Sequence, residues 1–203
     1  MKTRILLLCC IVLVLAGCAT TEVIDTWKDD SQVQKLKKVY VLGVINEPAY
    51  RRMVEYRLLN TLKKAGVDAH ATVDIFPNVD QIDKTAAATF IKENGVDGVM
   101  VVRLVDKKQE TVYTPGETYV VGSYGGRYMG GWHGYYGGAY QVMSTPGYTT
   151  EYLISTVEST IYRTDENKRV WSTVTETSET SVVQAIDSYI EVIDKQLKAS
   201  GLF

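Results

Sequence analysis

Beyond residue 18 the chain contains no cysteine, since its three cysteines are Cys9, Cys10 and Cys18. A domain that follows this point can form no disulfide and can offer no thiolate to a metal ion. Histidine is almost as scarce, with only His70 and His133 in 203 residues. Zinc sites use three or four ligands, chiefly histidine and cysteine, so two scattered histidines do not indicate a metal centre. We expect no bound metal and no cofactor.

An excess of positive charge is also missing. The chain has 22 Lys and Arg residues against 24 Asp and Glu residues, and its formal net charge is −2. A protein that binds the phosphate backbone needs concentrated positive charge, so we expect no nucleic-acid partner. One basic cluster, Lys35, Lys37 and Lys38, precedes an apolar run and is interpreted as the solvated entrance of a strand.

Motifs for nucleotide binding and for nucleophilic catalysis are absent. The first junction between a predicted strand and a predicted helix, VLGVINEPAY, has one glycine where a dinucleotide fold needs G-x-G-x-x-G, and there is no P-loop. The tetrapeptide Gly122–Gly125, GSYG, lacks the G-x-S-x-G spacing of a hydrolase. We therefore expect no nucleotide and predict no catalytic residue, which favours a non-enzymatic protein.

Four carboxylates and the two histidines are the remaining candidates for a catalytic or metal site. Asp29 with Asp30, and Asp165 with Glu166, are interpreted as solvated charge in a tether and a turn. His70 falls in a predicted strand, where a partly buried or edge position is expected. His133 lies in a glycine-rich segment in which nothing local would fix its tautomer.

The N-terminus carries an export signal. Lys2 and Arg4 precede an apolar run from Ile5 to Leu15, which is too short to cross a bilayer and is typical of a secretory signal peptide. The run ends in LAGC, residues 15–18, which resembles the lipobox of bacterial lipoproteins. That resemblance implies cleavage between Gly17 and Cys18 and lipidation of Cys18, so residues 1–17 would be the signal.

The lipobox resemblance also implies a location. Two or more acyl chains hold a protein stably on a bilayer, so Cys18 would tether the domain to the membrane. Lipoproteins retained at the inner membrane of enterobacteria usually carry aspartate after the cysteine, whereas this chain has Ala19. In a host with two membranes we therefore expect attachment to the outer membrane with the domain facing the periplasm, with the inner membrane or surface display as alternatives.

The pattern of apolar residues predicts one α/β domain over residues 37–203, after a polar tether over residues 18–36. A β-α-β-α-β order implies parallel strands, and an antiparallel hairpin and a C-terminal helix follow, which predicts a mixed sheet. The predicted strands are 37–44, 67–73, 97–113, 151–163 and 169–177. The helices have apolar stripes at helical spacing: Val54, Leu58, Leu62 and Ala65 after Pro48 with Asn46 near the cap; Ala87, Phe90 and Ile91 before Gly95; and Val182, Ile186, Tyr189, Ile190, Ile193 and Leu197 between Ser181 and Gly201.

The order of elements resembles small periplasmic domains such as the N-terminal part of TolB and curli-secretion-type lipoproteins. A wider resemblance, to uncharacterised bacterial envelope lipoproteins, runs through TWKDD, KKVYVLGV, RRMVEYRLLNTLKKAGVDA and TIYRTDENKRVWSTVTET and covers nearly the whole chain. These motifs are mostly structural and imply fold and location. The sequence shows no clear pair of long amphipathic membrane strands, which weighs against a pore like that of the curli secretion proteins.

An insertion over residues 122–148 separates the two halves of the predicted domain. Its first part, 122–140, holds eight of the sixteen glycines. Tyrosine and tryptophan give large contact areas with few rotors, and glycine permits close approach, so this segment is a candidate contact surface, and a plain loop between strands is the alternative. The candidate contact residues are Tyr124, Tyr128, Trp132, Tyr135, Tyr136 and Tyr140.

Two functions remain open on this evidence. The first is a lipid-anchored, non-enzymatic envelope protein that binds or scaffolds another envelope component, whose partners are the bilayer through Cys18 and an envelope protein or glycan. The second is an accessory protein of glycan processing or peptidoglycan synthesis that contacts carbohydrate through stacked aromatic side chains.

Overall fold

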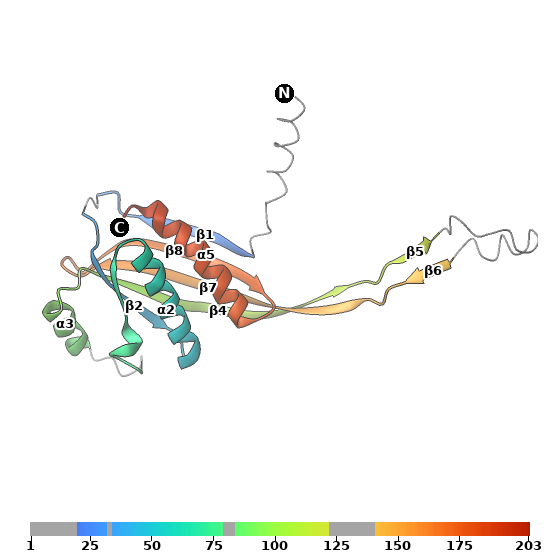
Figure 1. Ribbon diagram of the computed structural model, residues 1–203, viewed down its shortest axis with the longest axis horizontal. Coiled ribbons are helices and arrows are strands. Elements are labelled where there is room, and N and C mark those ends of the chain that lie inside the picture. Colours follow the sequence, from blue (N-terminus) through green and yellow to red (C-terminus); the bar gives the residue numbers. More distant parts are fainter. Residues whose placement is uncertain (1–19, 32–33, 79–83, 122–140) are drawn as a thin grey trace, which may run out of the picture. The chain divides into compact units, whose positions relative to one another are not determined.

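The computed structural model describes residues 20–31, 34–78, 84–121 and 141–203, and Figure 1 shows their helices and strands. Contacts divide the chain into two units. Unit 1 consists of the described residues up to Lys108 together with Leu153–Phe203, and unit 2 is Gln109–Tyr152. Two strands cross the boundary, so each contributes one part to each unit.

Unit 1 is built on a six-stranded mixed sheet with the strand order β1-β8-β7-β4-β2-β3. Strand β2 pairs in parallel with β3 and β4, whereas β8 pairs antiparallel with β7 and with β1. The mixed α/β sheet predicted from the sequence is thereby confirmed. The strands are β1 (Thr21–Lys28), β2 (Lys38–Val44), β3 (Asp68–Ala71), β4 (Gly98–Thr114), β7 (Tyr148–Arg163) and β8 (Lys168–Glu179).

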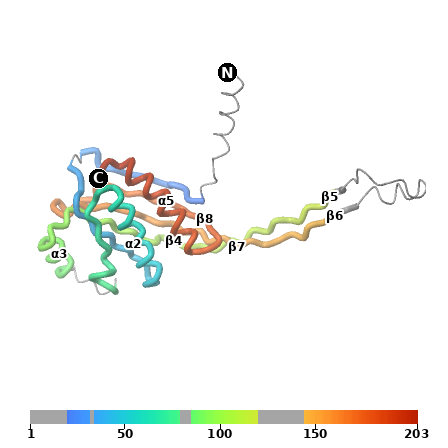
Figure 2. The backbone as a smooth tube through the Cα atoms, in the orientation of Figure 1, coloured from blue at the N-terminus to red at the C-terminus, as the bar shows by residue number. Residues whose placement is uncertain are grey.

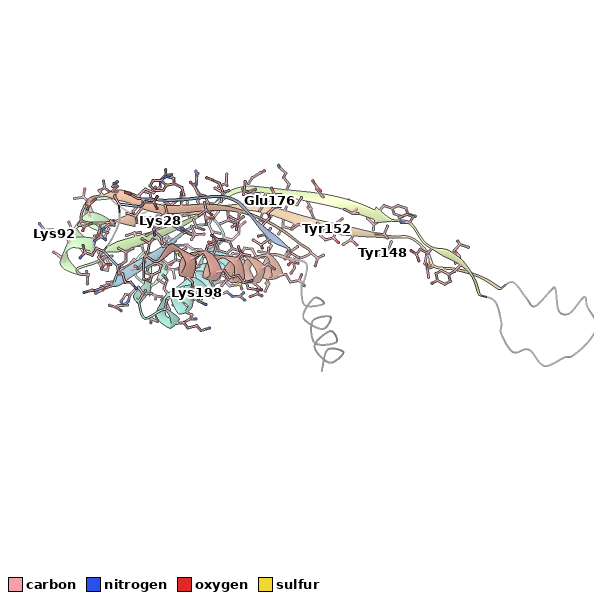
Figure 3. The ribbon with its side chains drawn as sticks, turned by 90° about the horizontal axis from the view of Figure 1, so that it is seen from above. Lys28, Lys92, Tyr148, Tyr152, Glu176 and Lys198 are labelled. Atoms are coloured by element: carbon pink, nitrogen blue, oxygen red, sulfur yellow. The ribbon has the colours of Figure 1, made fainter. Side chains whose placement is uncertain are left out.

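Two long helices, α2 and α5, lie over one face of this sheet and contact each other (Figures 1 and 3). A shorter helix, α3, and a 3-10 turn, η2, complete the connections between the parallel strands. Among the described residues, no helix is both long and apolar enough to span a membrane. The bounds are α2 (Pro48–Lys64), η2 (Thr72–Asp74), α3 (Lys84–Glu93) and α5 (Val182–Ser200).

Helix α5 forms as its sequence predicts. The Ser181 hydroxyl accepts a hydrogen bond from the amide of Gln184, which caps the first turn. Gly201 ends the helix with a φ of 66°, a left-handed conformation that glycine adopts without steric cost. The expected stripe faces the sheet: Ile186, Tyr189, Ile193 and Leu197 are buried.

Helix α2 matches its prediction except at its two ends. Pro48 occupies the first turn, but the N-cap is Glu47 rather than Asn46, and no side chain caps it. Val54, Leu58 and Leu62 are buried as expected. Ala65 is exposed, because it is the C-cap residue and no longer follows the helical stripe.

The core lies between the two helices and the sheet. Val39 and Val41 of β2 and Met100 of β4 are fully buried, as expected for parallel strands in the middle of a covered sheet. Trp171 of β8 is 1% exposed and joins the same cluster. Each such side chain stabilises the fold by roughly 1.5–3 kcal/mol.

The predicted tether over residues 18–36 was wrong for its central part. Thr21–Lys28 form β1, an edge strand paired with β8 from Thr21 opposite Thr177 to Lys28 opposite Trp171. Polar residues dominate this strand, which is why its sequence predicted a tether. Two of its threonines, the buried Thr21 and the exposed Thr26, bond to Thr177 and Thr173 of β8, so a strand can form there without an apolar stripe.

Unit 2 consists of paired strands. β5 (Thr118–Val121) pairs antiparallel with β6 (Gln141–Ser144), and the remaining parts of β4 and β7 lie side by side (Figures 1 and 2). β4 has 17 residues, close to the predicted strand 97–113, and β7 has 16 residues and begins three residues before the predicted strand 151–163. In unit 2 the described side chains are mostly exposed on both faces of these strands.

Candidate functional site

An apolar cavity of about 80 Å³ lies in unit 1 between helices α2 and α5 and the sheet. Its volume is roughly half that of a cavity that holds benzene, so it fits one apolar side chain or a group of similar size. Among the described residues that line it, only Glu47 and Lys107 are charged. The lining includes Tyr50 and Val54 of α2, Leu104 of β4, Val157 of β7, and Val182 and Ile186 of α5.

Hydroxyl groups form the polar part of the cavity wall. Ser155, Thr177 and Tyr189 line it, and each is almost fully buried. The Tyr189 hydroxyl lies 2.7 Å from the Ser159 hydroxyl, which is itself inaccessible to solvent. Burial raises the pKa of Tyr189 well above its usual range, against a smaller opposing effect of the Ser159 hydrogen bond, so the phenol stays neutral. These hydroxyl groups can orient a polar group in the cavity.

The carboxyl end of β2 is where an open parallel sheet usually binds a ligand. Here a side chain of the protein fills that position. The Glu55 carboxylate is fully buried and accepts hydrogen bonds from the Gly43 amide at 2.9 Å and the Val73 amide at 2.7 Å. It also accepts from the Thr72 hydroxyl at 3.1 Å. The amides that could bind an anionic ligand are therefore already used.

Arg51 completes this buried cluster. Its side chain is 2% exposed, and its Nε donates to Glu55 at 2.8 Å, one helical turn away. Its two other nitrogens donate to the Pro77 carbonyl and the Thr72 hydroxyl. An added Cβ at Gly43 would lie 3.2 Å from the Arg51 Cγ, so a larger residue there would require the Arg51 side chain to shift by a few tenths of an ångström. The cluster fastens β2, α2 and η2 together and is structural.

The signal for this cluster was present in the sequence. Arg51 and Glu55 fall on the same helical stripe as Leu58 and Leu62, where charged residues are unexpected. Charges at apolar positions with a spacing of four residues indicate a buried pair.

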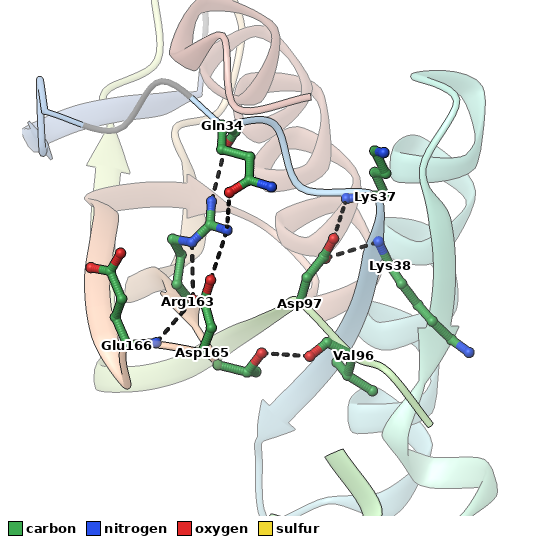
Figure 4. A network of polar contacts seen from close by, with 9 residues as sticks. Gln34, Lys37, Lys38, Val96, Asp97, Arg163, Asp165 and Glu166 are labelled. Atoms are coloured by element: carbon green, nitrogen blue, oxygen red, sulfur yellow. Dashed lines mark hydrogen bonds and ion pairs between the residues drawn. The ribbon is translucent and has the colours of Figure 1, made fainter. Parts of the chain in front are cut away.

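A second polar network joins the segment before β2 to the turn between β7 and β8 (Figure 4). Arg163, 4% exposed, donates two hydrogen bonds of 3.1 Å to Asp165 and one of 2.9 Å to the Gln34 carbonyl. The amides of Lys37 and Lys38 donate to the Asp97 carboxylate. Asp165 was predicted to be solvated charge, and it is 57% exposed but also binds Arg163.

Asp29 was also expected to be solvated charge in a tether, and this was wrong. Its side chain is 13% exposed and lies 2.6 Å from the Lys168 Nζ, while Ser31 donates to its other oxygen. The hydrogen bond from Lys168, and then those from Ser31, lower the pKa of Asp29 to about 2. The residue fixes the end of β1 to the start of β8.

The first described residue is held firmly by the end of the sheet. The Thr20 hydroxyl donates to Glu179 at 2.5 Å and lies 2.9 Å from the Ser188 hydroxyl, which itself donates to Glu179 at 2.6 Å. The Thr20 carbonyl accepts from the Ser178 amide. These hydrogen bonds lower the pKa of Glu179, so its carboxylate is charged at neutral pH. Thr20 is therefore part of the fold.

The three most exposed aromatic side chains among the described residues lie in unit 2. Tyr113 is 64% exposed, Tyr148 62% and Tyr119 45%, and the neighbouring Val112 is 46% exposed. The strands that carry them are joined by polar contacts, including a pair of hydrogen bonds between Glu117 and the Thr145 hydroxyl. Exposed aromatic side chains offer a large contact area, so these are available for contact with a partner. A two-stranded ribbon is only marginally stable alone in water, and such a contact would stabilise it.

Most of the site residues predicted from the sequence lie outside the described residues. These are Gly17 and Cys18 of the lipobox, His133, and the candidate contact residues Tyr124, Tyr128, Trp132, Tyr135, Tyr136 and Tyr140. The described residues contain no group of three potential metal ligands.

His70 is the one candidate histidine that the structure describes. It lies on β3, an edge strand, as expected, and its side chain is 41% exposed. Its ring stacks on Tyr40 with centroids 4.9 Å apart, and its Nε2 lies 2.9 Å from Asp68. Tyr40 also packs edge-on against Phe90 of α3. These contacts hold the His70 ring against Tyr40, next to α3, so its role is structural.

Comparisons with known proteins give structural likeness only. No family model matches the sequence, and none of the curated proteins matches it. The chain is similar to PelC from Paraburkholderia phytofirmans, solved as a dodecamer, with a TM-score of 0.48 and 14% identity over 90% of this chain and 96% of that chain. It is also similar to lipoprotein GNA1162 from Neisseria meningitidis, with a TM-score of 0.41 and 10% identity over 81% of this chain and 99% of that chain.

Proposed function

We propose that this protein is a lipid-anchored, non-enzymatic component of the bacterial envelope that binds another envelope component through unit 2. The observation that carries the proposal is the group of exposed side chains Val112, Tyr113, Tyr119 and Tyr148 on paired strands. The segment 122–140 lies between β5 and β6 in the sequence and adds five tyrosines and a tryptophan. Tyrosine is enriched in contact surfaces because it gives large area for few rotors.

The anchor in this proposal is Cys18, which the lipobox resemblance supports. In a host with two membranes, Ala19 favours the outer membrane, with the domain facing the periplasm. Cys18→Ser should abolish labelling with radioactive palmitate and release the protein or leave it unprocessed. Ala19→Asp should move the lipidated protein to the inner-membrane fraction in an enterobacterial host. Palmitate on the Cys18→Ser protein would refute the anchor.

The partner surface is tested by photo-crosslinking in cells. A benzophenone amino acid replaces Tyr113, Tyr119 or Tyr148, one at a time, and conserves an aromatic ring at each position. The matched control is Tyr162 of unit 1, which is 38% exposed. We expect one discrete crosslinked product, shared by the unit 2 positions and absent from the control. Products that are equally strong at Tyr162 would contradict the proposal.

A further inference from the structure

The folded part of unit 1 begins very close in the sequence to Cys18, the proposed anchor. Strand β1 begins at Thr21, and Thr20 already bonds to Glu179, Ser188 and Ser178 at the end of β8 and on α5. If Cys18 is lipidated, as the proposed function requires, only Ala19 separates it from Thr20. Two residues span at most about 7 Å when fully extended. The anchor therefore allows little freedom between the bilayer and the domain.

We infer that the end of unit 1 formed by Thr20, the end of β8 and the start of α5 rests in the lipid headgroup layer, with the turn between β7 and β8 directed away from the membrane. This inference rests on the proposed lipidation of Cys18. Five neutral residues are exposed at the membrane-facing end: Thr20, Thr180, Ser181, Val183 and Gln184. The carboxylate of Glu179 is half-buried at the same end and accepts hydrogen bonds from Thr20 and Ser188. The exposed side chains are therefore repelled by neither zwitterionic nor anionic headgroups.

The opposite end is far from this surface. β8 runs from Lys168 to Glu179, which at about 3.3 Å per residue separates its two ends by roughly 36 Å. Asp165 and Glu166 lie in the turn before β8 and are exposed. The connection between Cys18 and Thr20 spans at most about 7 Å and holds the Thr20 end of unit 1 close to the bilayer. The opposite end, with Asp165 and Glu166, could reach the headgroups as well only if the domain lay flat.

The broad faces of unit 1 give no support to a flat orientation. Val157 lines the cavity beneath α5, so its neighbour Glu158 points to the other face of the sheet. There Glu158 forms an ion pair of 2.6 Å with Arg103. The helix side carries exposed charges as well, among them Lys64 and Lys198. Both faces would have to bury charge against lipid.

The same end holds other features of unit 1. Leu153, where the chain re-enters unit 1 from unit 2, pairs with Glu179. Thr177 and Val182 line the apolar cavity and lie next to the Thr20 contacts. The cavity and the unit 1 part of β7 therefore begin beside the residues that hold Thr20.

The test uses the scarcity of cysteine. With Cys18 lipidated, the processed chain has no free thiol, so a single added cysteine carries a fluorophore selectively. Thr180→Cys and Gln184→Cys report on the membrane-facing end, and Glu166→Cys reports on the far end. The lipidated full chain is reconstituted into phosphatidylcholine vesicles that contain a lipid with a quencher on its headgroup. We expect quenching at least about threefold stronger at positions 180 and 184 than at 166, given their separation.

A matched variant carries about ten Gly and Ser residues inserted between Ala19 and Thr20. Such a linker adds a reach of about 18 Å and leaves the Thr20 contacts in place, so quenching at 180 should fall toward the value at 166. A protein that floats with the vesicles but is quenched equally at 166 and 180 would overturn this inference alone. A protein that carries no lipid and does not float would overturn the proposed anchor, and the inference with it.

Discussion

Replacement of Glu55 by glutamine should destabilise the domain strongly. Glu55 is fully buried, and its carboxylate accepts four hydrogen bonds, three on Oε1 and one on Oε2. Glutamine has the same shape but one acceptor, so its amide NH₂ must face either the Val73 amide or the other three donors. Arg51 would also keep its charge, with 2% exposure and no counter-ion.

The expected loss is about 3–5 kcal/mol, the range for a buried ion pair broken by removal of one partner. For a domain of this size that corresponds to a fall in melting temperature of roughly 6–20 °C. Urea unfolding followed by far-UV circular dichroism measures the free energy. The matched control is Glu191→Gln, which removes an exposed partner of Lys195 at the same spacing of four residues. That change should cost only a few tenths of a kcal/mol.

A double variant separates charge from packing. Arg51→Met with Glu55→Met removes both charges, so it should recover part of the loss, although the Gly43 and Val73 amides lose their acceptor. A Glu55→Gln protein as stable as Glu191→Gln would refute the assignment of Glu55 and Arg51 as a buried structural pair.

Two further predictions concern polar contacts of unit 1. Tyr189→Phe leaves the buried Ser159 hydroxyl without its partner and should lower the free energy of unfolding by about 1–3 kcal/mol. Adding Ser159→Ala to the same chain should restore part of that free energy. Urea unfolding that shows no recovery in the double variant would contradict the contact. Asp29 has a pKa lowered to about 2 by Lys168 and Ser31, so its ionised form stabilises the fold above its ordinary pKa of 3.8, and this stabilisation is lost as pH falls through about 2. Asp29→Asn should therefore be less stable than the parent at pH 7, and the difference should shrink as pH falls below 3.8 and vanish below about 2. A difference in thermal unfolding that stays constant across that range would count against the bond.

Local sequence patterns were sufficient for much of unit 1. β2, α2, β4 and α5 were predicted close to their bounds because each buries an apolar run or stripe that is complete within its own segment. The hairpin of β7 and β8 was predicted because its two strands are adjacent in the sequence. For α5, Ser181 and Gly201 marked both ends.

The structural features that were not predicted depend on contacts with residues far away in the sequence. β1 is polar and becomes a strand only because β8 offers it a matching row of threonines, with Thr21 bonded to Thr177 across 156 positions. The apolar cavity draws its walls from both long helices and three strands, and no local pattern encodes such a space. β5 and β6 were not predicted, because each has only four residues and the two are separated in the sequence by the glycine-rich segment 122–140.

The pairing of β1 with β8 sets an order of events during folding. The partner of Thr21–Lys28 is β8, the last described strand, so this part of the sheet forms only after residues 168–179 have been made. Closure of so long a loop is slow relative to local folding. If Cys18 is processed as proposed, cleavage next to Thr20 has time to occur before the sheet is complete.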